Sequence, residues 1–410
     1  MRSSAFLYPW DVVGDPGAPR RLAALGVRQA TLAAAYHSTR ALTPRHPGTR
    51  IVTARHSAVY YRPGPARWRG RALRPYEQDW VPGDDPFEAA RSALAAAGID
   101  VHSWVVLAHN SRLGGEHPRI AVRNAYGERY PWALCVAQPE VAEYAALLAA
   151  EAAVRPGAGG VELESCGWYG LAHLHAHDKI AGVPLGPVGQ YLMSLCFCPA
   201  CERGYAAAGA GPAELRAAVR AALEPLWRGG AEPSGGSERE RIAALLGEGL
   251  AGAALAHRTA AAYAFQRTVV EAVRAAAGPG FRILLHADPV AHHSGPNCGV
   301  EVARVMEFAD GLVVPAPLVS GAAALMPAGA VLAANLGIVA GAGGDPAGLH
   351  LPEGATELRL YHAGLASDED LRKAAAALRA LGRTAPRPPG GRSGGGGRGA
   401  PGGRGGRGAP

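Results

Sequence analysis

Short apolar segments recur along the chain and are separated by longer segments with helical patterning. Eight of them have the length and composition of buried strands, at residues 5–10, 27–36, 101–107, 161–164, 281–286, 311–315, 331–335 and 357–362. Helix boundaries lie between them, such as Asp84-Asp85-Pro86 at the start of one helix and Gly98 at its end. Eight strands that alternate with helices are typical of an α/β protein with a (β/α)8 TIM barrel. We therefore predict such a barrel over residues 1–383.

Three segments do not fit the barrel repeat. Residues 39–85 carry nine arginines and several aromatic residues, which predicts an ordered, lid-like insertion. Residues 205–278 contain more alanine- and leucine-rich helix than one barrel connection needs, so we expect an inserted helical subdomain between strands four and five. Residues 384–410 consist mainly of Gly, Arg and Pro and cannot bury a core, which predicts a disordered tail.

Composition and charge narrow the range of partners. The alanine-rich chain has 48% hydrophobic and 18% charged residues, as expected for a globular protein with a substantial core. Its net charge is +7, but residues 382–410 hold six arginines and no acid, so removing them leaves +1. We therefore expect no nucleic-acid partner for the barrel.

Because no secretory signal and no spanning apolar run are visible, we expect a cytoplasmic protein without a membrane partner. The oligomeric state stays open.

Candidate catalytic residues are acidic side chains at strand ends. Glu162 and Glu164 alternate with apolar residues, so both carboxylates share the inner face of strand four. Asp288 follows strand five in the same way. Glycoside hydrolysis needs two carboxylates, one as acid and the other as nucleophile or base. We assign Glu164 and Asp288 to this pair, with Glu162 tuning a pKa. Two alternatives stay open: Glu162 as part of a structural ion pair and Asp288 as a turn or cap residue before Pro289.

Polar and aromatic residues near the other strand ends and loops are predicted to line a cleft. Sugar rings stack on aromatic faces, so this enrichment suits a carbohydrate ligand, whereas core packing is the alternative for Trp104. The predicted substrate-binding residues are Asp11, His37, His109, Asn110, Trp168, Tyr169, His175, His177, Asp178, Lys179, His286, Asn335 and Tyr361.

Two groups of residues could hold a metal ion. His173, His175 and His177 alternate in one loop and could bind Zn²⁺, although sugar-contacting or surface histidines are the alternative. Cys196, Cys198 and Cys201 have the spacing of a structural zinc site, but three thiols leave it incomplete. Completion would need Cys166, Cys135, Cys298 or a loop histidine. The alternative is a helix start with small buried thiols.

An ordered series of motifs resembles the uncharacterised glycosyl-hydrolase-like TIM barrels. The matching residues are Leu107–Ser111, His117-Pro118, Asn124–Gly127, Cys135 with Pro139–Val141, Gly160–Glu164 and Cys196–Cys201. The resemblance implies a barrel that acts on or binds a carbohydrate, with Glu164 as a catalytic candidate. It departs from the well-known retaining barrel glycosidases on strand seven, where Ala333–Leu336 contains no glutamate.

These observations predict a glycoside hydrolase-like enzyme that requires no cofactor, with a structural zinc as an option. The chain contains neither a phosphate-binding glycine loop nor a G-x-S-x-G nucleophile elbow, which argues against nucleotide-dependent and serine-hydrolase chemistry. Two alternatives stay open. One is a metal-dependent hydrolase that uses His173, His175 and His177, and the other is a non-catalytic carbohydrate-binding barrel.

Overall fold

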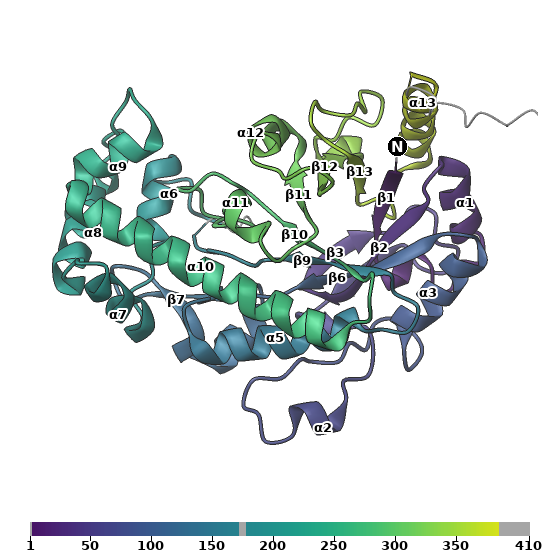
Figure 1. Ribbon diagram of the computed structural model, residues 1–410, viewed down its shortest axis with the longest axis horizontal. Coiled ribbons are helices and arrows are strands. Elements are labelled where there is room, and N and C mark those ends of the chain that lie inside the picture. Colours follow the sequence, from purple (N-terminus) through teal and green to yellow (C-terminus); the bar gives the residue numbers. More distant parts are fainter. Residues whose placement is uncertain (1, 172–177, 385–410) are drawn as a thin grey trace, which may run out of the picture.

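A ring of eight parallel strands forms the centre of the molecule. The computed structural model describes residues 2–171 and 178–384 (Figure 1). β1 (Arg2–Leu7) pairs with both β2 (Gln29–Tyr36) and β13 (Glu357–Tyr361), which closes the ring. Between β2 and β13 come, in spatial order, β6 (Asp100–Val106), β9 (Gly160–Glu164), β10 (Arg282–His286), β11 (Gly311–Pro315) and β12 (Val331–Gly337). The predicted (β/α)8 barrel and its eight strands are confirmed.

The helical layer around the ring is uneven. The longer helices are α1 (Ala18–Leu25), α3 (Pro86–Ala96), α5 (Pro139–Ala153), α10 (Glu248–Ala276) and α13 (Asp368–Thr384). The longest of them, α10, runs alongside α5 (Figure 1). After β10 and β11 the helices shorten to α11 (Val302–Val305) and α12 (Val319–Ala323), and a 3-10 turn at Ala340–Ala342 is the only helical element between β12 and β13 in the described chain.

Three long excursions follow the C-terminal ends of β2, β6 and β9, the end at which TIM barrels build their sites. The first contains β3 (Thr39–Leu42), β4 (Ile51–Ala54), β5 (Ala58–Val59) and α2 (Pro65–Trp68). The second contains α4 (Ser111–Glu116), a 3-10 turn at Pro118–Ile120 and the hairpin of β7 (Ala121–Arg123) and β8 (Arg129–Leu134). The third contains α6 (Pro187–Met193), α7 (Pro199–Ala207), α8 (Pro212–Trp227) and α9 (Glu238–Leu246), and α7, α8 and α9 gather at one end of the molecule (Figure 1).

Two of the apolar, helix-patterned segments after β9 each form a pair of helices in the structure. In the segment 185–208, α6 and α7 are separated by residues 194–198, which include Cys196 and Cys198. The segment 238–277 consists of α9 and α10, separated at Gly247, which has a φ of +81°. This left-handed conformation is readily adopted by glycine, so Gly247 can end one helix and open the next.

The barrel interior holds a buried ion pair. Arg359 Nε donates to Glu162 Oε1 at 2.7 Å, and Arg359 Nη1 donates to Glu357 Oε2 at 2.9 Å. Thr31 Oγ1 also donates to Glu162 Oε1, at 3.1 Å. Burial alone would raise the pKa of Glu162, but the charge of Arg359 and the contact with His286 outweigh it and lower this pKa to about 2. Glu162 is therefore a compensated charge that ties β9 to β13 across the barrel.

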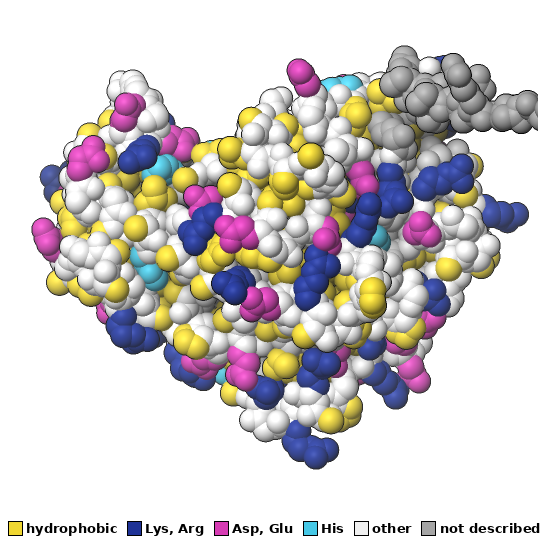
Figure 2. All heavy atoms as spheres, viewed as in Figure 1, with side chains coloured by type: hydrophobic (Ala, Val, Ile, Leu, Met, Phe, Trp, Pro, Cys, Tyr) yellow, Lys and Arg dark blue, Asp and Glu magenta, His cyan; other side chains and the backbone are white. Residues whose placement is uncertain are grey.

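The molecular surface carries charge of both signs. Basic and acidic side chains are interspersed on the face shown in Figure 2, as expected for a barrel whose charge is nearly balanced. Among the helices of the described chain, none is both long and apolar enough to cross a bilayer.

Replacing Arg359 with Met should destabilise the barrel by about 3–5 kcal/mol, because Glu162 would stay buried without its partner. Urea denaturation followed by circular dichroism measures this change. Arg282→Met is the matched control, since Arg282 makes a more exposed pair with Glu357 at 3.2 Å and should cost less than about 1 kcal/mol. Equal losses in the two variants would contradict the role assigned to the buried pair.

Candidate functional site

Glu164 lies at the C-terminal end of β9, one inward position above Glu162. Its Oε2 accepts a hydrogen bond from Trp104 Nε1 on β6 at 2.7 Å, and the residue is 6% exposed. In the parallel register Glu164 lies opposite Val106, and Glu162 lies opposite Trp104. The Trp104 indole therefore extends along the barrel from the level of Glu162 to the level of Glu164. Its hydrogen bond holds the Glu164 carboxylate at the barrel mouth.

Four tyrosines near the strand ends lie close enough to Glu164 to feel its charge. They are Tyr8 after β1, Tyr36 at the end of β2, Tyr169 after β9 and Tyr361 at the end of β13. Burial raises the pKa of each phenol, and the negative charge of Glu164 raises it further. Glu164 is therefore a buried acid in a largely aromatic part of the barrel mouth.

Histidine rings extend this aromatic rim. His37 stacks on Tyr36 with ring centroids 4.2 Å apart and on His109 at 4.4 Å, and His109 stacks on Tyr169 at 4.7 Å. On the other side of Tyr36, the Tyr8 hydroxyl hydrogen-bonds His362 Nδ1 at 3.1 Å. Burial lowers the pKa of His362 to about 4, so its ring is neutral at physiological pH. The rim is thus continuous from β13 through β1, β2 and β6 to β9.

Backbone strain is located at this same rim. Ser165 (φ 59°) and His362 (φ 61°) are the two non-glycine residues with positive φ in the described chain, and they directly follow Glu164 and Tyr361. Such conformations cost energy for residues with a side chain and cluster at functional sites. The Ser165 N–H donates to Asn297 Oδ1 at 3.1 Å, a contact that helps to hold the unfavourable turn.

Asp288 faces a cavity that lies beside the barrel mouth. Its Oδ2 lies 2.7 Å from His293 Nδ1, and its Oδ1 accepts the Val290 N–H at 3.0 Å. The cavity has a volume of about 430 Å³ and is also lined by residues 294–298 and by Pro187, Gln190 and Pro315. The Asn297 contact with Ser165 joins this wall to the end of β9. Glu164 and Asp288 therefore lie on connected loops but have different immediate neighbours.

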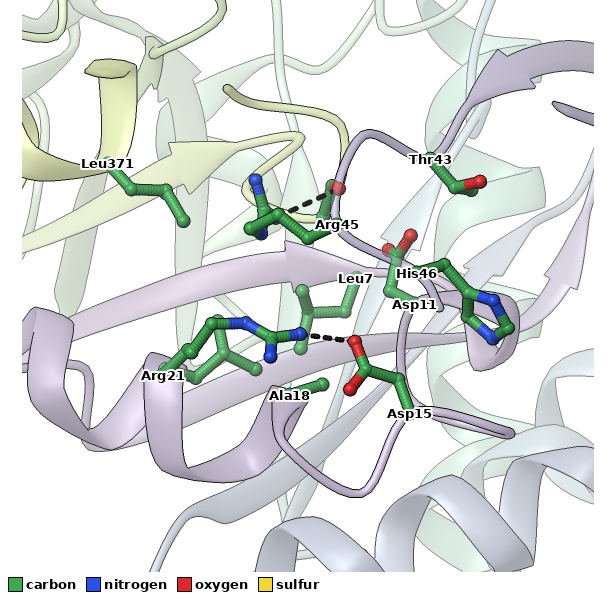
Figure 3. Close-up of a pocket in the computed structure, with 11 residues that line it drawn as sticks. Leu7, Asp11, Asp15, Ala18, Arg21, Thr43, Arg45, His46 and Leu371 are labelled. Atoms are coloured by element: carbon green, nitrogen blue, oxygen red, sulfur yellow. Dashed lines mark hydrogen bonds and ion pairs between the residues drawn. The ribbon is translucent and has the colours of Figure 1, made fainter. Parts of the chain in front are cut away.

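Asp11 belongs to a second, small cavity between β1, α1 and α13. The cavity has a volume of about 20 Å³, room for about one water molecule, and Arg45 also lines it (Figure 3). Asp11 Oδ2 accepts the Tyr8 N–H at 2.8 Å, whereas Oδ1 has no hydrogen-bond partner among the described residues. Burial raises the pKa of Asp11 to about 7, and the Tyr8 N–H and Arg45 only partly oppose this shift.

Several other predicted substrate-binding residues have structural contacts. Trp168 is buried and donates from Nε1 to the Arg258 carbonyl oxygen at 2.7 Å, which packs it against α10. Asn110 caps α4 by accepting the Leu113 N–H at 3.0 Å. His286 lies inside the barrel, with Nε2 3.7 Å from Glu162 Oε2. We therefore leave these three out of the cleft.

The remaining predicted residues are spread over the mouth and its loops. Asn335 on β12 has a buried Oδ1 without a hydrogen-bond partner among the described residues, so it could accept a ligand hydroxyl. Asp178 and Lys179 are exposed on the loop after β9. His173, His175 and His177 lie outside the described residues, as does the predicted tail from residue 385 onward.

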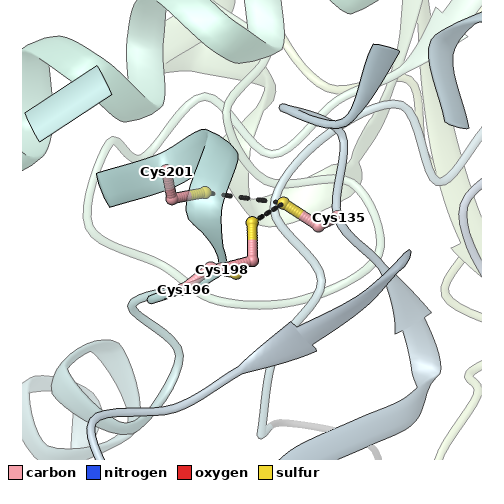
Figure 4. Close-up of side chains that lie close together, drawn as sticks. All are labelled: Cys135, Cys196, Cys198 and Cys201. Atoms are coloured by element: carbon pink, nitrogen blue, oxygen red, sulfur yellow. Dashed lines mark hydrogen bonds between the residues drawn. The ribbon is translucent and has the colours of Figure 1, made fainter. Parts of the chain in front are cut away.

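Four cysteine sulfurs meet beside the second and third excursions (Figure 4). Cys135 joins Cys196, Cys198 and Cys201, and all four sulfurs lie within 4.8 Å of one another in a buried cluster. Of the candidates considered for a fourth thiol, Cys135 is the one present in this group. The described chain therefore contains one set of side chains with the composition of a tetrathiolate metal site.

Sequence reasoning missed Tyr8, Tyr36 and His362 as rim residues. Tyr8 and Tyr36 were included in apolar strand segments, where a tyrosine reads as core. Their position at the strand ends is the signal that could have identified them, because inward residues at that end face the mouth. His362 ends the predicted strand 357–362 and so carries the same signal, but its orientation depends on the left-handed backbone after β13, which the pattern does not predict.

Comparisons with known proteins bear on the fold. No protein-family model and no curated protein matches the sequence. Among solved structures, the chain is similar to the catalytic domain of β-amylase from Paenibacillus polymyxa, with a TM-score of 0.54, 12% identity, and coverage of 94% of this chain and 99% of that one. It is also similar to the PgaB (BpsB) glycoside hydrolase domain from Bordetella bronchiseptica, with a TM-score of 0.53, 13% identity, and coverage of 92% and 98%.

A third similar structure is α-L-fucosidase isoenzyme 2 from Paenibacillus thiaminolyticus, with a TM-score of 0.52 and 14% identity. The match covers 93% of this chain and 50% of the fucosidase, so the chain spans about half the length of that protein. At these identities the likeness shows the (β/α)8 barrel fold.

Replacing Asp11 with Asn should change how stability depends on pH. The folded-state pKa of about 7 exceeds the ordinary 3.8, so the native state binds this proton more tightly. The contribution of Asp11 to the free energy of unfolding is at its maximum below about pH 4. It is lost as the pH rises to about 7, a change of roughly 2–4 kcal/mol. Asparagine does not titrate in this range, so the variant does not lose this contribution. Its melting temperature should therefore rise relative to that of the wild type as the pH increases from 5 to 8. Parallel profiles in thermal denaturation would contradict the assignment.

Proposed function

We propose that this chain is a glycoside-hydrolase-like enzyme that acts on a carbohydrate at the C-terminal mouth of the barrel. The observation that carries the proposal is Glu164, a carboxylate held by Trp104 at 2.7 Å at the barrel mouth, where the aromatic rim also lies. TIM barrels build their active sites at this end of the strands. No cation among the described residues is in hydrogen-bond contact with Glu164, and burying such an acid is costly, so its retention at the mouth favours a chemical role.

The rim supplies the kind of surface that a sugar ring needs. Pyranose rings carry apolar C–H faces and equatorial hydroxyls, which suit aromatic faces and polar ring edges respectively. His37, His109, Tyr169 and Tyr361 provide such faces around Glu164, and the hydroxyls of Tyr8 and Tyr36 provide polar edges. We propose these six residues as the sugar-contacting wall, with Asn335 accepting a sugar hydroxyl.

Asp288 is proposed as the second carboxylate. Its cavity of about 430 Å³ has room for water beside the leaving or attacking atoms, and His293 holds the carboxylate in place at 2.7 Å. In this assignment Glu164 protonates the glycosidic oxygen, and Asp288 removes a proton from the attacking water. Water adds to the anomeric carbon as the bond to the leaving oxygen breaks. Glu162 acts as a positioning residue, because its ion pair with Arg359 fixes the strand that carries Glu164.

One observation favours a second candidate, a carbohydrate-binding barrel without hydrolysis. β12 carries Ala333, Ala334 and Asn335 where retaining barrel glycosidases would place a glutamate. The same aromatic rim would bind sugar in that case. Sugar binding without release of new reducing ends would distinguish this candidate from the enzyme.

Glu164→Gln should abolish hydrolysis while leaving the fold intact, since the amide keeps the size and the acceptor for Trp104. We expect turnover to fall by about 10²–10⁴-fold in a reducing-end assay over a panel of oligosaccharides and aryl glycosides. Glu307→Gln, at a surface carboxylate that accepts a hydrogen bond from Tyr263, is the control and should keep full activity. Undiminished turnover by a folded Glu164→Gln protein would refute the catalytic assignment.

The proposed roles also predict the stereochemical outcome. With Asp288 activating water from a roomy cavity, hydrolysis should invert the anomeric configuration, which requires carboxylates about 6.5–9.5 Å apart. Proton NMR of the first product formed reports the configuration directly. A retained configuration would show instead that a carboxylate attacks the sugar, and the role of Asp288 as base would then be wrong.

A further inference from the structure

The cysteine cluster lies outside the proposed active site and has the geometry of a metal centre. Cys135 Sγ is 3.7 Å from Cys198 Sγ and 3.5 Å from Cys201 Sγ, and all four sulfurs lie within 4.8 Å of one another. A tetrahedral zinc ion with Zn–S bonds of about 2.3 Å holds its sulfurs roughly 3.8 Å apart. The two separations from Cys135 therefore match such an ion to within a few tenths of an ångström, and the other pairs are no more than 4.8 Å apart. They exceed the S–S bond of a disulfide, which is about 2.05 Å.

Backbone polar groups also lie at the cluster. The backbone N–H of Arg123 donates to Cys196 Sγ at 3.4 Å. Cys198 is the N-cap of α7, so the positive end of a nine-residue helix lies beside the cluster. The end of β7 and the start of α7 thus both present polar backbone to the four sulfurs, as is common around metal-bound thiolates.

We propose that Cys135, Cys196, Cys198 and Cys201 bind one structural zinc ion that fastens the second excursion of the barrel to the third. All four positions of a tetrahedral ion are filled by protein sulfurs, and the four residues are fully buried. A closed, buried site of this kind leaves no position for a substrate or a reactive water, so the metal has no part in the hydrolysis.

The two segments that the zinc joins also carry rim residues. Cys135 follows β8, and β8 contacts the end of β6: Leu134 N–H donates to Ala108 O at 2.9 Å, and Asn110 N–H donates to Trp132 O at 3.2 Å. His109 lies between these contacts. Loss of the metal should therefore loosen the support of His109.

The third excursion is connected in the same way to the loop that carries Tyr169. Trp132 Nε1 on β8 donates to Gly170 O at 2.8 Å, and Tyr130 OH donates to Met193 O at 2.9 Å. Ser194 Oγ, just before the cluster, accepts the Leu171 N–H at 2.9 Å. The zinc would thus hold two neighbouring parts of the aromatic rim in register, although it contacts neither.

The metal content of the purified full chain tests this inference. Inductively coupled plasma mass spectrometry should find about one zinc per chain, and Cys135→Ser should reduce it to a small fraction of that value. Cys298→Ser is the matched control, because Cys298 is equally buried but lies outside the cluster, and it should keep the zinc. Retained zinc in a folded Cys135→Ser protein would overturn the inference.

Two measurements on the unmodified chain keep the test decisive if the variant does not fold. Growth with cobalt should give the visible ligand-field spectrum of a tetrahedral tetrathiolate site. Removal of the zinc by a chelator under reducing conditions should increase amide hydrogen exchange in residues 121–135 and 187–207 and leave β11 and β12 unchanged. A wild-type chain with no zinc, with iron in its place, or with a disulfide among the four cysteines contradicts the proposal. These readouts do not depend on hydrolysis, so their failure is distinct from a failure of the proposed function.

Discussion

The charge pair between Glu162 and Arg359 is the interaction on which the arrangement of this barrel depends. Burying two opposite charges is favourable only when both are well paired, and here the 2.7 Å contact joins β9 to β13 through the barrel interior. Glu164 is two residues further along β9, so the pair also sets the height and direction of the residue proposed to do chemistry. Thr31 and His286 add contacts from two more strands. Core stability and the position of the mouth are thereby coupled.

The mouth combines features that oppose stability. A carboxylate is held among aromatic rings, and the chain takes left-handed turns at Ser165 and His362 directly after two barrel strands. A sequence optimised for stability alone would place glycine at such turns and an apolar residue at position 164. The cost is concentrated at one end of the barrel, whereas the opposite end shows no such non-glycine turn in the described chain. This asymmetry is what a binding or catalytic site produces.

Sequence patterns predicted the barrel well because its signals are local. Each strand is a short apolar run, and helix caps such as Asp85 and Gly26 lie next to the residues they cap. The site depends on contacts between distant residues. Cys135 is 61 positions from Cys196 and carries no motif of its own, so a single sequence could offer it only as one of several partners. The role of Glu162 could likewise not be decided without Arg359, which lies 197 positions further along the chain.

The closing of the ring between β1 and β13 has a consequence for how the chain acquires its structure. Residues 2–7 precede the seven other strands of the ring in the chain, yet one of their two strand partners, residues 357–361, follows all the others. Until β13 pairs with it, β1 has an unpaired edge, and Glu162 has no arginine beside it. Contacts between residues so far apart in sequence are slow to form and expose strand edges meanwhile. β13 is therefore the strand that closes the barrel. A nascent chain that stops before residue 359 has an open sheet, and the buried charge of Glu162 is not compensated.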